Sequence, residues 1–310
     1  MVLRLLTKDE NLLEAELTKI NLTEKFQVGY TWESMDCELV TPIHGGGVTA
    51  RESDDKLPIR VAAIRGQLRF GWRMLAKYEW KLTDNELRKQ EFALWGGMED
   101  GDENGKASLV FLRVQLKNKF KAAPLSDYVK NINDTLGYAL FTARGTRNGL
   151  PEMKLGKEGL QWQLQWQFSK SITDQQREQF FETLRWWVTL GGIGGRIRRG
   201  CGVFLANHDE IKLVSEQEMK EMGCSILFLG GMKNSVTDAW KDAVDSWKET
   251  RRKYKAEFKN LLGKDNEHSR HLATVLSRPV FDKEKQKWCG MVIMLPNSGE
   301  KIKEILGVPQ

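Results

Sequence analysis

LQWQLQWQF, at residues 160–168, alternates apolar and amide side chains with a period of two. Successive side chains of a β-strand point to opposite faces, so this stretch predicts a strand with one apolar face and one glutamine face. We expect the apolar face to be buried against helices. The glutamine face is then either open to solvent or covered by a neighbouring domain.

The elements around this strand follow from the periodicity of the apolar residues. After it we expect a helix that begins at Thr173 or Asp174 and runs to about Leu190, then a glycine-rich loop and a short strand at residues 203–207. Before it the pattern predicts, in chain order, a strand at 32–43, helices at 59–80 and 85–95, a strand at 108–116 and a long excursion at 117–157.

This order of strands and helices predicts an α+β fold on the split βαβ, or ferredoxin-like, plan, enlarged by the extra helix and the excursion. A second, shortened ferredoxin-like (RRM-like) unit is expected from a strand at 224–229, a helix at 236–262, a strand pair at 273–281 and 288–295, and a last helix at 300–306. The predicted organisation is an N-terminal arm (residues 1–30), a first domain (31–210) that contains the glycine-rich loop, and a smaller second domain (211–310).

The composition excludes several classes of protein. Of the 310 residues, 40% are hydrophobic and 29% are charged, which is typical of a globular chain and not of a disordered or fibrous one. No apolar run approaches the ~20 residues that a membrane helix needs, and the first ten residues do not resemble a signal peptide. We therefore expect a cytoplasmic protein that does not bind membranes.

No pattern in the sequence predicts a metal site. A structural zinc site needs paired ligands at short spacing, and the cysteines form no CxxC pair. The acidic turn at residues 99–103 lacks the alternating ligands of a calcium loop, so we interpret it as a solvated loop. The close histidines His268 and His271 have no second ligand pair beside them. We expect reduced, partly buried thiols at Cys37, Cys201, Cys224 and Cys289.

Positive charge is concentrated in two segments. The chain has 48 Lys and Arg residues against 42 Asp and Glu, a net charge of +6. Residues 58–81 carry six basic side chains and one acidic one, and residues 191–202 carry three arginines and no acid. Concentrated charge, mostly from arginine, predicts a binding site for a polyanion. A solvated basic face is the alternative interpretation of such a run.

The arginines of the first segment lie on one side of the expected helix. Arg65, Arg69 and Arg73 recur every fourth residue and therefore stack as one row, which we call the arginine stripe. Arg60 lies near the start of the same helix. Aligned like charges repel one another, and an anionic partner along the stripe would remove that cost.

The second segment, GGIGGRIRRGCG at residues 191–202, is the glycine-arginine loop. Glycines let successive backbone N–H groups form a concave anion site, and arginines add bidentate donors suited to phosphate. A phosphate loop for a nucleotide cofactor runs from a strand into a helix, whereas this loop leaves a helix and enters a strand. We therefore expect a nucleic-acid strand here rather than a cofactor, held by this loop and the arginine stripe together.

Three motifs point to a known family. The first is PIR at residues 58–60, followed by IRGQLRF at 64–70 and WR at 72–73. The second is the strand that ends in Thr41-Pro42, with three glycines at 45–47, and the third is the glycine-arginine loop. Together they resemble the RAMP superfamily, and the helix motif resembles that of the first Cmr subunit of the type III-B CRISPR effector complex. The alanines at 62–63 and the Gly-Trp at 71–72 depart from the family pattern, and the C-terminal third matches no motif.

The resemblance implies a non-catalytic RNA-binding subunit that needs no cofactor or metal. Such a subunit lies toward the 3′ end of the guide RNA, helps to engage the target RNA, and contacts other Cmr subunits, including neighbouring RAMP proteins. Together with His44, which follows the first strand, the matched positions give these candidates for RNA contact: Arg60, Arg65, Arg69, Arg73, Gly194, Gly195, Arg196, Arg198 and Arg199.

Two alternatives stay open. Some RAMP proteins are metal-independent endoribonucleases that use a histidine as general base, and His44 stands beside three glycines where such a base could lie. A turn histidine whose ring bonds a neighbouring backbone group is the other interpretation of His44. The chain could also be a protein-only scaffold of the complex, without RNA affinity of its own.

Overall fold

The computed structural model describes residues 32–45, 51, 53–97, 105–131, 134–145, 149–254 and 275–296. The expected N-terminal arm, the acidic turn at 99–103, His268, His271, the end of the helix expected at 236–262 and the last helix at 300–306 lie outside the described residues. From Ser34 on, the described residues form one compact unit. The domain boundary expected near residue 210 stays a prediction.

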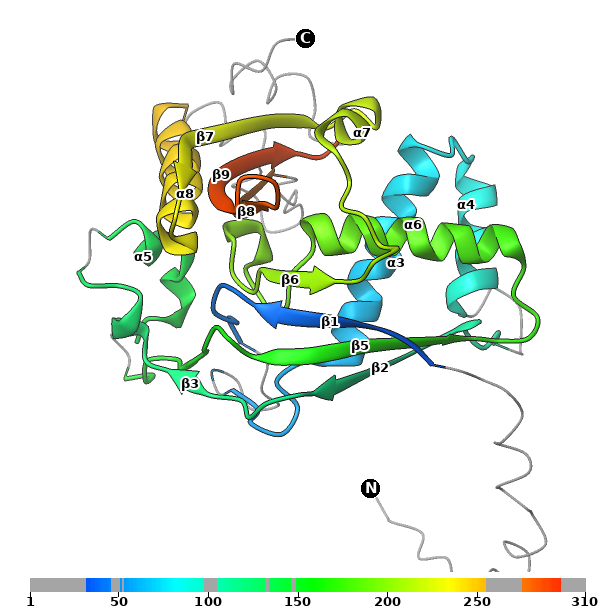
Figure 1. Cartoon of the computed structure of the whole chain (residues 1–310), viewed down its shortest axis with the longest axis horizontal. Helices are drawn as coiled ribbons and strands as arrows, with labels where there is room; N and C mark the ends of the chain where they lie inside the picture. Colours follow the sequence, from blue (N-terminus) through cyan, green and yellow to red (C-terminus); the bar gives the residue numbers. More distant parts are fainter. Residues whose placement is uncertain are drawn as a thin grey trace, which may run out of the picture. The chain divides into compact units, whose positions relative to one another are not determined.

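The first sheet contains the glutamine-rich strand and is four-stranded (Figure 1). Its strands are β1 (Glu33–Leu39), β2 (Val110–Leu116), β5 (Gln161–Phe168) and β6 (Phe204–Asn207), in the spatial order β2-β5-β1-β6. β2 pairs antiparallel with β5, from Val110 opposite Phe168 to Leu116 opposite Trp162. β1 pairs antiparallel with β6. Each of these strands lies where the sequence predicts one.

The helices of this region are α3 (Val61–Tyr78), α4 (Asp84–Trp95) and α6 (Asp174–Leu190). Thr83 and Thr173 begin α4 and α6 with capping boxes, in which each threonine hydroxyl accepts a hydrogen bond from a first-turn N–H. The core between helices and sheet includes Trp162, Trp166 and Phe180, all fully buried. The apolar face of β5 is therefore buried, as the alternation of its residues predicts.

The opposite face of β5 is a polar network. Gln161 is exposed and Gln165 is buried. Gln163 donates a hydrogen bond to Oδ1 of Asp36 on β1 at 3.0 Å, and Arg113 of β2 donates one to Gln165. The amide groups of this face are thus bonded to neighbouring strands.

A second antiparallel sheet follows the helix α7 (Glu216–Glu221). It consists of β7 (Ser225–Lys233), β8 (Val275–Asp282) and β9 (Lys287–Met294), in the order β7-β9-β8. The helix α8 (Val236–Lys253) packs on this sheet through buried residues that include Trp247 (Figure 1). Two antiparallel sheets with helices packed on them confirm the predicted α+β class.

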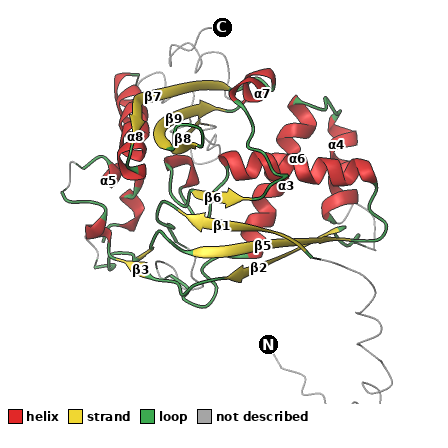
Figure 2. Ribbon diagram, viewed as in Figure 1, coloured by secondary structure: helices red, strands yellow, loops and turns green. Residues whose placement is uncertain are grey.

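The excursion between β2 and β5 folds into short elements (Figure 2). They are β3 (Ala122–Ala123), the 3-10 turn η1 (Leu125–Asp127), α5 (Leu136–Ala139), the 3-10 turn η2 (Phe141–Ala143) and β4 (Leu155–Gly156). Leu136 and Leu140 share a buried cluster with Trp240 and Val244 of α8. The excursion thus packs against a helix about 100 residues later in the sequence.

The apolarity of the helices and the state of the cysteines can be compared with the predictions. None of the described helices is long and apolar enough to cross a membrane. The four cysteines are free and buried, which agrees with the expectation of reduced thiols. Burial raises the pKa of the Cys201 thiol to about 12, so this thiol is inert at neutral pH.

Candidate nucleic-acid interface

The arginine stripe of α3 is bonded within the fold. Arg65 donates a hydrogen bond from Nη1 to the hydroxyl of Ser108 at 2.7 Å and one from Nη2 to the carbonyl of Val110 at 3.0 Å. Burial, and then the charge of Arg69, lower the pKa of the Arg65 guanidinium. Arg65 therefore fastens α3 to the start of β2.

The other two stripe arginines share one buried carboxylate. Arg69 and Arg73 each lie 2.8 Å from Oε1 of Glu91, which projects from α4 and is 6% exposed. Glu91 thus offsets part of the repulsion between Arg69 and Arg73. Arg60 precedes α3, is exposed, and makes a long ion pair of 3.9 Å with Asp54.

A different side of α3 meets the glycine-arginine loop. The side-chain amide of Gln67 donates to the carbonyl of Gly192 at 2.7 Å and accepts from the N–H of Gly192 at 3.2 Å. Because successive helical residues are about 100° apart, Gln67 lies about 160° around the helix from Arg65 and Arg69. The structure therefore does not bring the arginine stripe and the loop into one surface.

His44 and two glycines of the loop do come together. The N–H of Gly195 donates to the carbonyl of His44 at 2.7 Å. Gly194 has a φ of +80°, and a Cβ at this position would lie 2.7 Å from Cγ2 of Ile43. Only glycine suits such a positive φ and close approach. Gly194 and Gly195 are both exposed, and the N–H of Gly195 is already bonded to His44.

Arg196 and His44 connect the loop to the excursion. Arg196 donates from Nη2 to the carbonyl of Tyr138 at 2.9 Å and from Nε to the carbonyl of Ala139. Nε2 of His44 lies 2.7 Å from the hydroxyl of Thr142. Burial, followed by the charge of Arg196, lowers the pKa of the His44 imidazole, which is therefore neutral at neutral pH.

Arg199 lies between two aromatic rings. Its guanidinium is 5.3 Å from the ring centroid of Trp247 and 5.7 Å from that of Tyr138. Burial lowers the pKa of Arg199 to about 10. The pKa of Arg198 is lowered by burial and then by the charge of Arg196. These guanidiniums are thus partly desolvated and repel one another.

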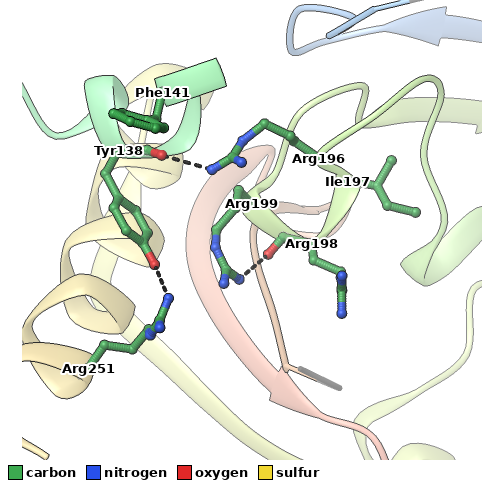
Figure 3. Close-up of a pocket in the computed structure, with 7 residues that line it drawn as sticks. All are labelled: Tyr138, Phe141, Arg196, Ile197, Arg198, Arg199 and Arg251. Carbon is green, nitrogen blue, oxygen red and sulfur yellow. Dashed lines mark hydrogen bonds between the residues drawn. The ribbon is translucent and has the colours of Figure 1, made fainter. Parts of the chain in front are cut away.

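The loop arginines line a pocket of about 630 Å³ (Figure 3). Arg251, from the end of α8, joins them and donates from Nη1 to the hydroxyl of Tyr138 at 3.0 Å. Among the described residues that line it, four are arginines and none is acidic: Tyr138, Phe141, Arg196, Ile197, Arg198, Arg199 and Arg251. The pocket is therefore cationic with an aromatic wall, a combination that suits a phosphate and a base.

Residues of the second sheet and of α8 donate hydrogen bonds to backbone carbonyls of the glycine-arginine loop. The indole of Trp240 on α8 donates to the carbonyl of Arg199 at 2.6 Å, and Ser277 of β8 donates to the carbonyl of Arg198 at 3.3 Å. Arg278, also on β8 and 3% exposed, donates to the carbonyl of Gly191 at 2.9 Å. With their carbonyls bonded on this side, Arg198 and Arg199 are fixed where they line the pocket.

A comparison with protein-family models identifies the superfamily of this chain. The sequence matches the family model of the RAMP superfamily over residues 36–204. This region is more than half of the chain and includes the end of β1, all of α3 and the glycine-arginine loop. The chain belongs to the RAMP superfamily.

Solved structures share the fold of this RAMP protein. It resembles Cmr1 from Pyrococcus furiosus in its apo form, with a TM-score of 0.57 and 18% identity over 85% of this chain and 87% of that chain. It also resembles a chain of the type III-B Cmr-beta complex bound to cognate target RNA and AMPPNP in the presence of ssDNA, with a TM-score of 0.53 and 13% identity over 90% and 99% of the two chains. No curated protein sequence matches this chain.

Several residues that line the pocket or pair with the stripe were not predicted. Tyr138 and Phe141 belong to the excursion, where the short apolar piece at 136–141 was the available signal. Arg251 begins a basic run, Arg251-Arg252-Lys253, that signals a cationic helix end. Glu91, which pairs with two arginines of the stripe, has no local signature. In the described part of the chain, no group of three or more His, Cys, Asp or Glu residues could hold a metal ion.

Proposed function

We propose that this RAMP protein is a non-catalytic RNA-binding subunit of a type III-B CRISPR effector complex. The family match and the fold similarity to Cmr1 and to a Cmr-beta chain support the proposal. In this role it contacts guide RNA, target RNA or both, near the 3′ end of the guide, and binds other Cmr subunits.

The cationic pocket is the observation that carries the proposal. Four arginines from two segments line one pocket, and burial and mutual repulsion lower the pKa of Arg198 and Arg199. An RNA phosphate bound there relieves this repulsion and accepts bidentate hydrogen bonds from the guanidiniums. RNA binding thus offsets the unfavourable free energy of placing four guanidiniums close together.

We assign the RNA contacts mainly to the glycine-arginine loop. Gly194 and Gly195 present exposed backbone beside Arg196, Arg198 and Arg199, with His44 behind them. We assign a smaller part to the arginine stripe, because Glu91 already pairs with two of its members. Arg60 is the exception, since it is exposed and its ion pair is long.

The assignment of two ferredoxin-like units is part of the same proposal. In chain order the strands of the first sheet are β1, β2, β5 and β6, and their spatial order β2-β5-β1-β6 is that expected when two split βαβ units interlock. The second sheet, with order β7-β9-β8 and the helix α8 after β7, fits the same plan without its last helix and strand. We propose two ferredoxin-like units on this basis.

Titration of RNA binding against salt tests the function. A fluorescently labelled 20-nucleotide RNA is titrated with the purified protein between 50 and 300 mM salt. Each neutralised phosphate adds about 0.7 to 0.9 to the slope of log affinity against log salt. Arg198→Ala and Arg251→Ala should each weaken binding and flatten the slope by about one phosphate. Arg252→Ala is the matched control, since Arg252 is the next residue of α8 and does not line the pocket.

Two results would contradict the proposal. The first is that Arg198→Ala and Arg251→Ala bind RNA with the same affinity and the same salt slope as Arg252→Ala. The second is wild-type protein that enters the effector complex in pull-downs before and after ribonuclease treatment but binds no RNA alone, which would favour the protein-only scaffold.

A further inference from the structure

One lining residue of the pocket is apolar and unusually exposed. Phe141 begins the η2 turn, directly after α5, and its side chain is 63% exposed. It lines the pocket together with the four arginines (Figure 3). An exposed aromatic ring that shares a pocket with four guanidiniums offers a π-face to a ligand whose phosphate those guanidiniums could bind.

The backbone around Phe141 is held on its N-terminal side by the glycine-arginine loop. Arg196 bonds the carbonyls of Tyr138 and Ala139, which lie three and two residues before Phe141. Tyr138 is itself held, because Arg251 donates to its hydroxyl and Arg199 lies over its ring.

The backbone is also held on the C-terminal side. His44 bonds the hydroxyl of Thr142, the residue after Phe141. Arg51 donates from Nη1 to the carbonyl of Thr142 at 3.2 Å and from Nη2 to that of Arg144 at 2.6 Å. The exposed ring therefore stands on a turn that polar contacts fix from both directions, so little entropy is lost when a ligand packs on it.

We propose that Phe141 is a stacking platform for one unpaired RNA base, whose neighbouring phosphate is bound by the pocket arginines. The site then prefers single-stranded RNA to a duplex, because the bases of a duplex are stacked on one another and their faces are not available. Base–aromatic stacking tolerates every base, since each has a π-face, so the preference is for strandedness and not for sequence. This inference rests on the proposed function, whose phosphate contacts it shares.

The contacts give His44 and Arg51 a positioning role in this arrangement. Neither needs to touch RNA, because each acts on the backbone or hydroxyl beside the ring. His44 thereby links the loop that binds phosphate to the turn that carries the platform. This accounts for its burial and its neutral imidazole without a role in proton transfer.

The test compares two substitutions of exposed phenylalanines. Phe141→Leu keeps an apolar side chain but removes the π-face, and Phe111→Leu does the same on β2, where Phe111 is 46% exposed and away from the pocket lining. Each variant and the wild type are titrated with a 12-nucleotide RNA of mixed sequence, single-stranded or annealed to its complement.

We expect Phe141→Leu to weaken single-strand binding on the order of tenfold, with little change for the duplex. Phe141→Trp should retain the single-strand preference, and Phe111→Leu should behave as wild type. A 2-aminopurine base in the single strand should be quenched on binding by wild type and less so by Phe141→Leu.

The outcomes separate this inference from the proposed function. If Phe141→Leu binds both RNAs as wild type does, with the same salt slope, the platform is wrong and the phosphate site stands. If wild type binds neither RNA, the proposed function itself fails. If Phe141→Leu leaves RNA binding intact but weakens capture by other Cmr subunits, Phe141 is a protein contact and the inference is overturned.

Discussion

Arg69 and Glu91 form a two-bond contact between α3 and α4. Nε and Nη2 of Arg69 both lie 2.8 Å from Oε1 of Glu91, and Arg73 contacts the same oxygen. Glu91 is the buried partner, whereas Arg73 keeps 44% of its side chain exposed. Two arginines of the stripe therefore also form an ion-pair cluster that joins the two helices.

Glu91→Gln should destabilise the fold by about 1–3 kcal/mol, because two aligned guanidiniums lose their shared counter-charge. Urea unfolding followed by circular dichroism measures this change. Glu178→Gln is the control, because Glu178 is an exposed residue of α6, and its effect should stay below about 0.5 kcal/mol. Equal stabilities of the two variants would show that the cluster contributes nothing to the packing of α4.

Gly200→Ala should cost more stability than Gly159→Ala, although both glycines have positive φ angles of +75° and +83°. A Cβ at position 200 would lie 2.5 Å from Nε1 of Trp240, whereas one at 159 meets no atom within 4 Å. In Gly159→Ala we expect the positive φ alone to lower the free energy of unfolding by about 1 kcal/mol. In Gly200→Ala the clash with Trp240 should lower it by at least about 2 kcal/mol more. Thermal unfolding of the two variants decides this, and equal costs would mean that Trp240 does not pack on the loop.

Trp240→Phe should weaken both the fold and RNA binding. The substitution removes the N–H that donates to the carbonyl of Arg199, so a part-buried carbonyl loses its partner at a cost of about 1–3 kcal/mol. Ser277→Ala, which removes the longer bond to the carbonyl of Arg198, should have a smaller effect. RNA affinity measured well below the unfolding temperature tests the positioning role, and wild-type affinity in Trp240→Phe would argue against it.

Stability should fall as the pH is lowered through the range in which His44 titrates. Burial and the charge of Arg196 lower the pKa of His44 in the folded state below its usual value near 6.5. The unfolded chain therefore binds more protons than the folded chain between these two pKa values. The contribution of neutral His44 to the free energy of unfolding is complete above about pH 6.5 and is lost as the pH falls toward the pKa of the folded state. Urea unfolding at several pH values from 7.5 to 5.0 should show a shallower decline for His44→Gln, and an unchanged decline would contradict this origin.

Incubation of the protein with repeat RNA in the absence of metal ions should leave the RNA uncut. The Nε2 of His44 is already bonded to Thr142, and the residue is only 9% exposed, so it is badly placed to accept a proton from a ribose hydroxyl. Denaturing gel electrophoresis of the RNA checks this. Site-specific cleavage that disappears in His44→Ala would instead support the metal-independent endoribonuclease.

Prediction from the sequence was most successful where one periodicity dominates. The alternation in β5 and the three- and four-residue spacing in α3 and α6 are local properties, and these elements lie within a few residues of their expected bounds. The capping of α6 by Thr173 is equally local. The excursion was harder to interpret, because its short turns are stabilised by contacts with α8 rather than by their own pattern.

The sequence by itself determined the main strands and helices of the two sheets, their order, the α+β class and the two segments that carry the positive charge. Only the tertiary structure decided which of those charges pair with an acid inside the fold and which line the pocket. Glu91 lies 22 residues from Arg69 and pairs with it, whereas Arg251 lies 52 residues after Arg199 and lines the same pocket. Charges act through distance in space, and the distance between residues remote in the chain is set by packing, which no local pattern records.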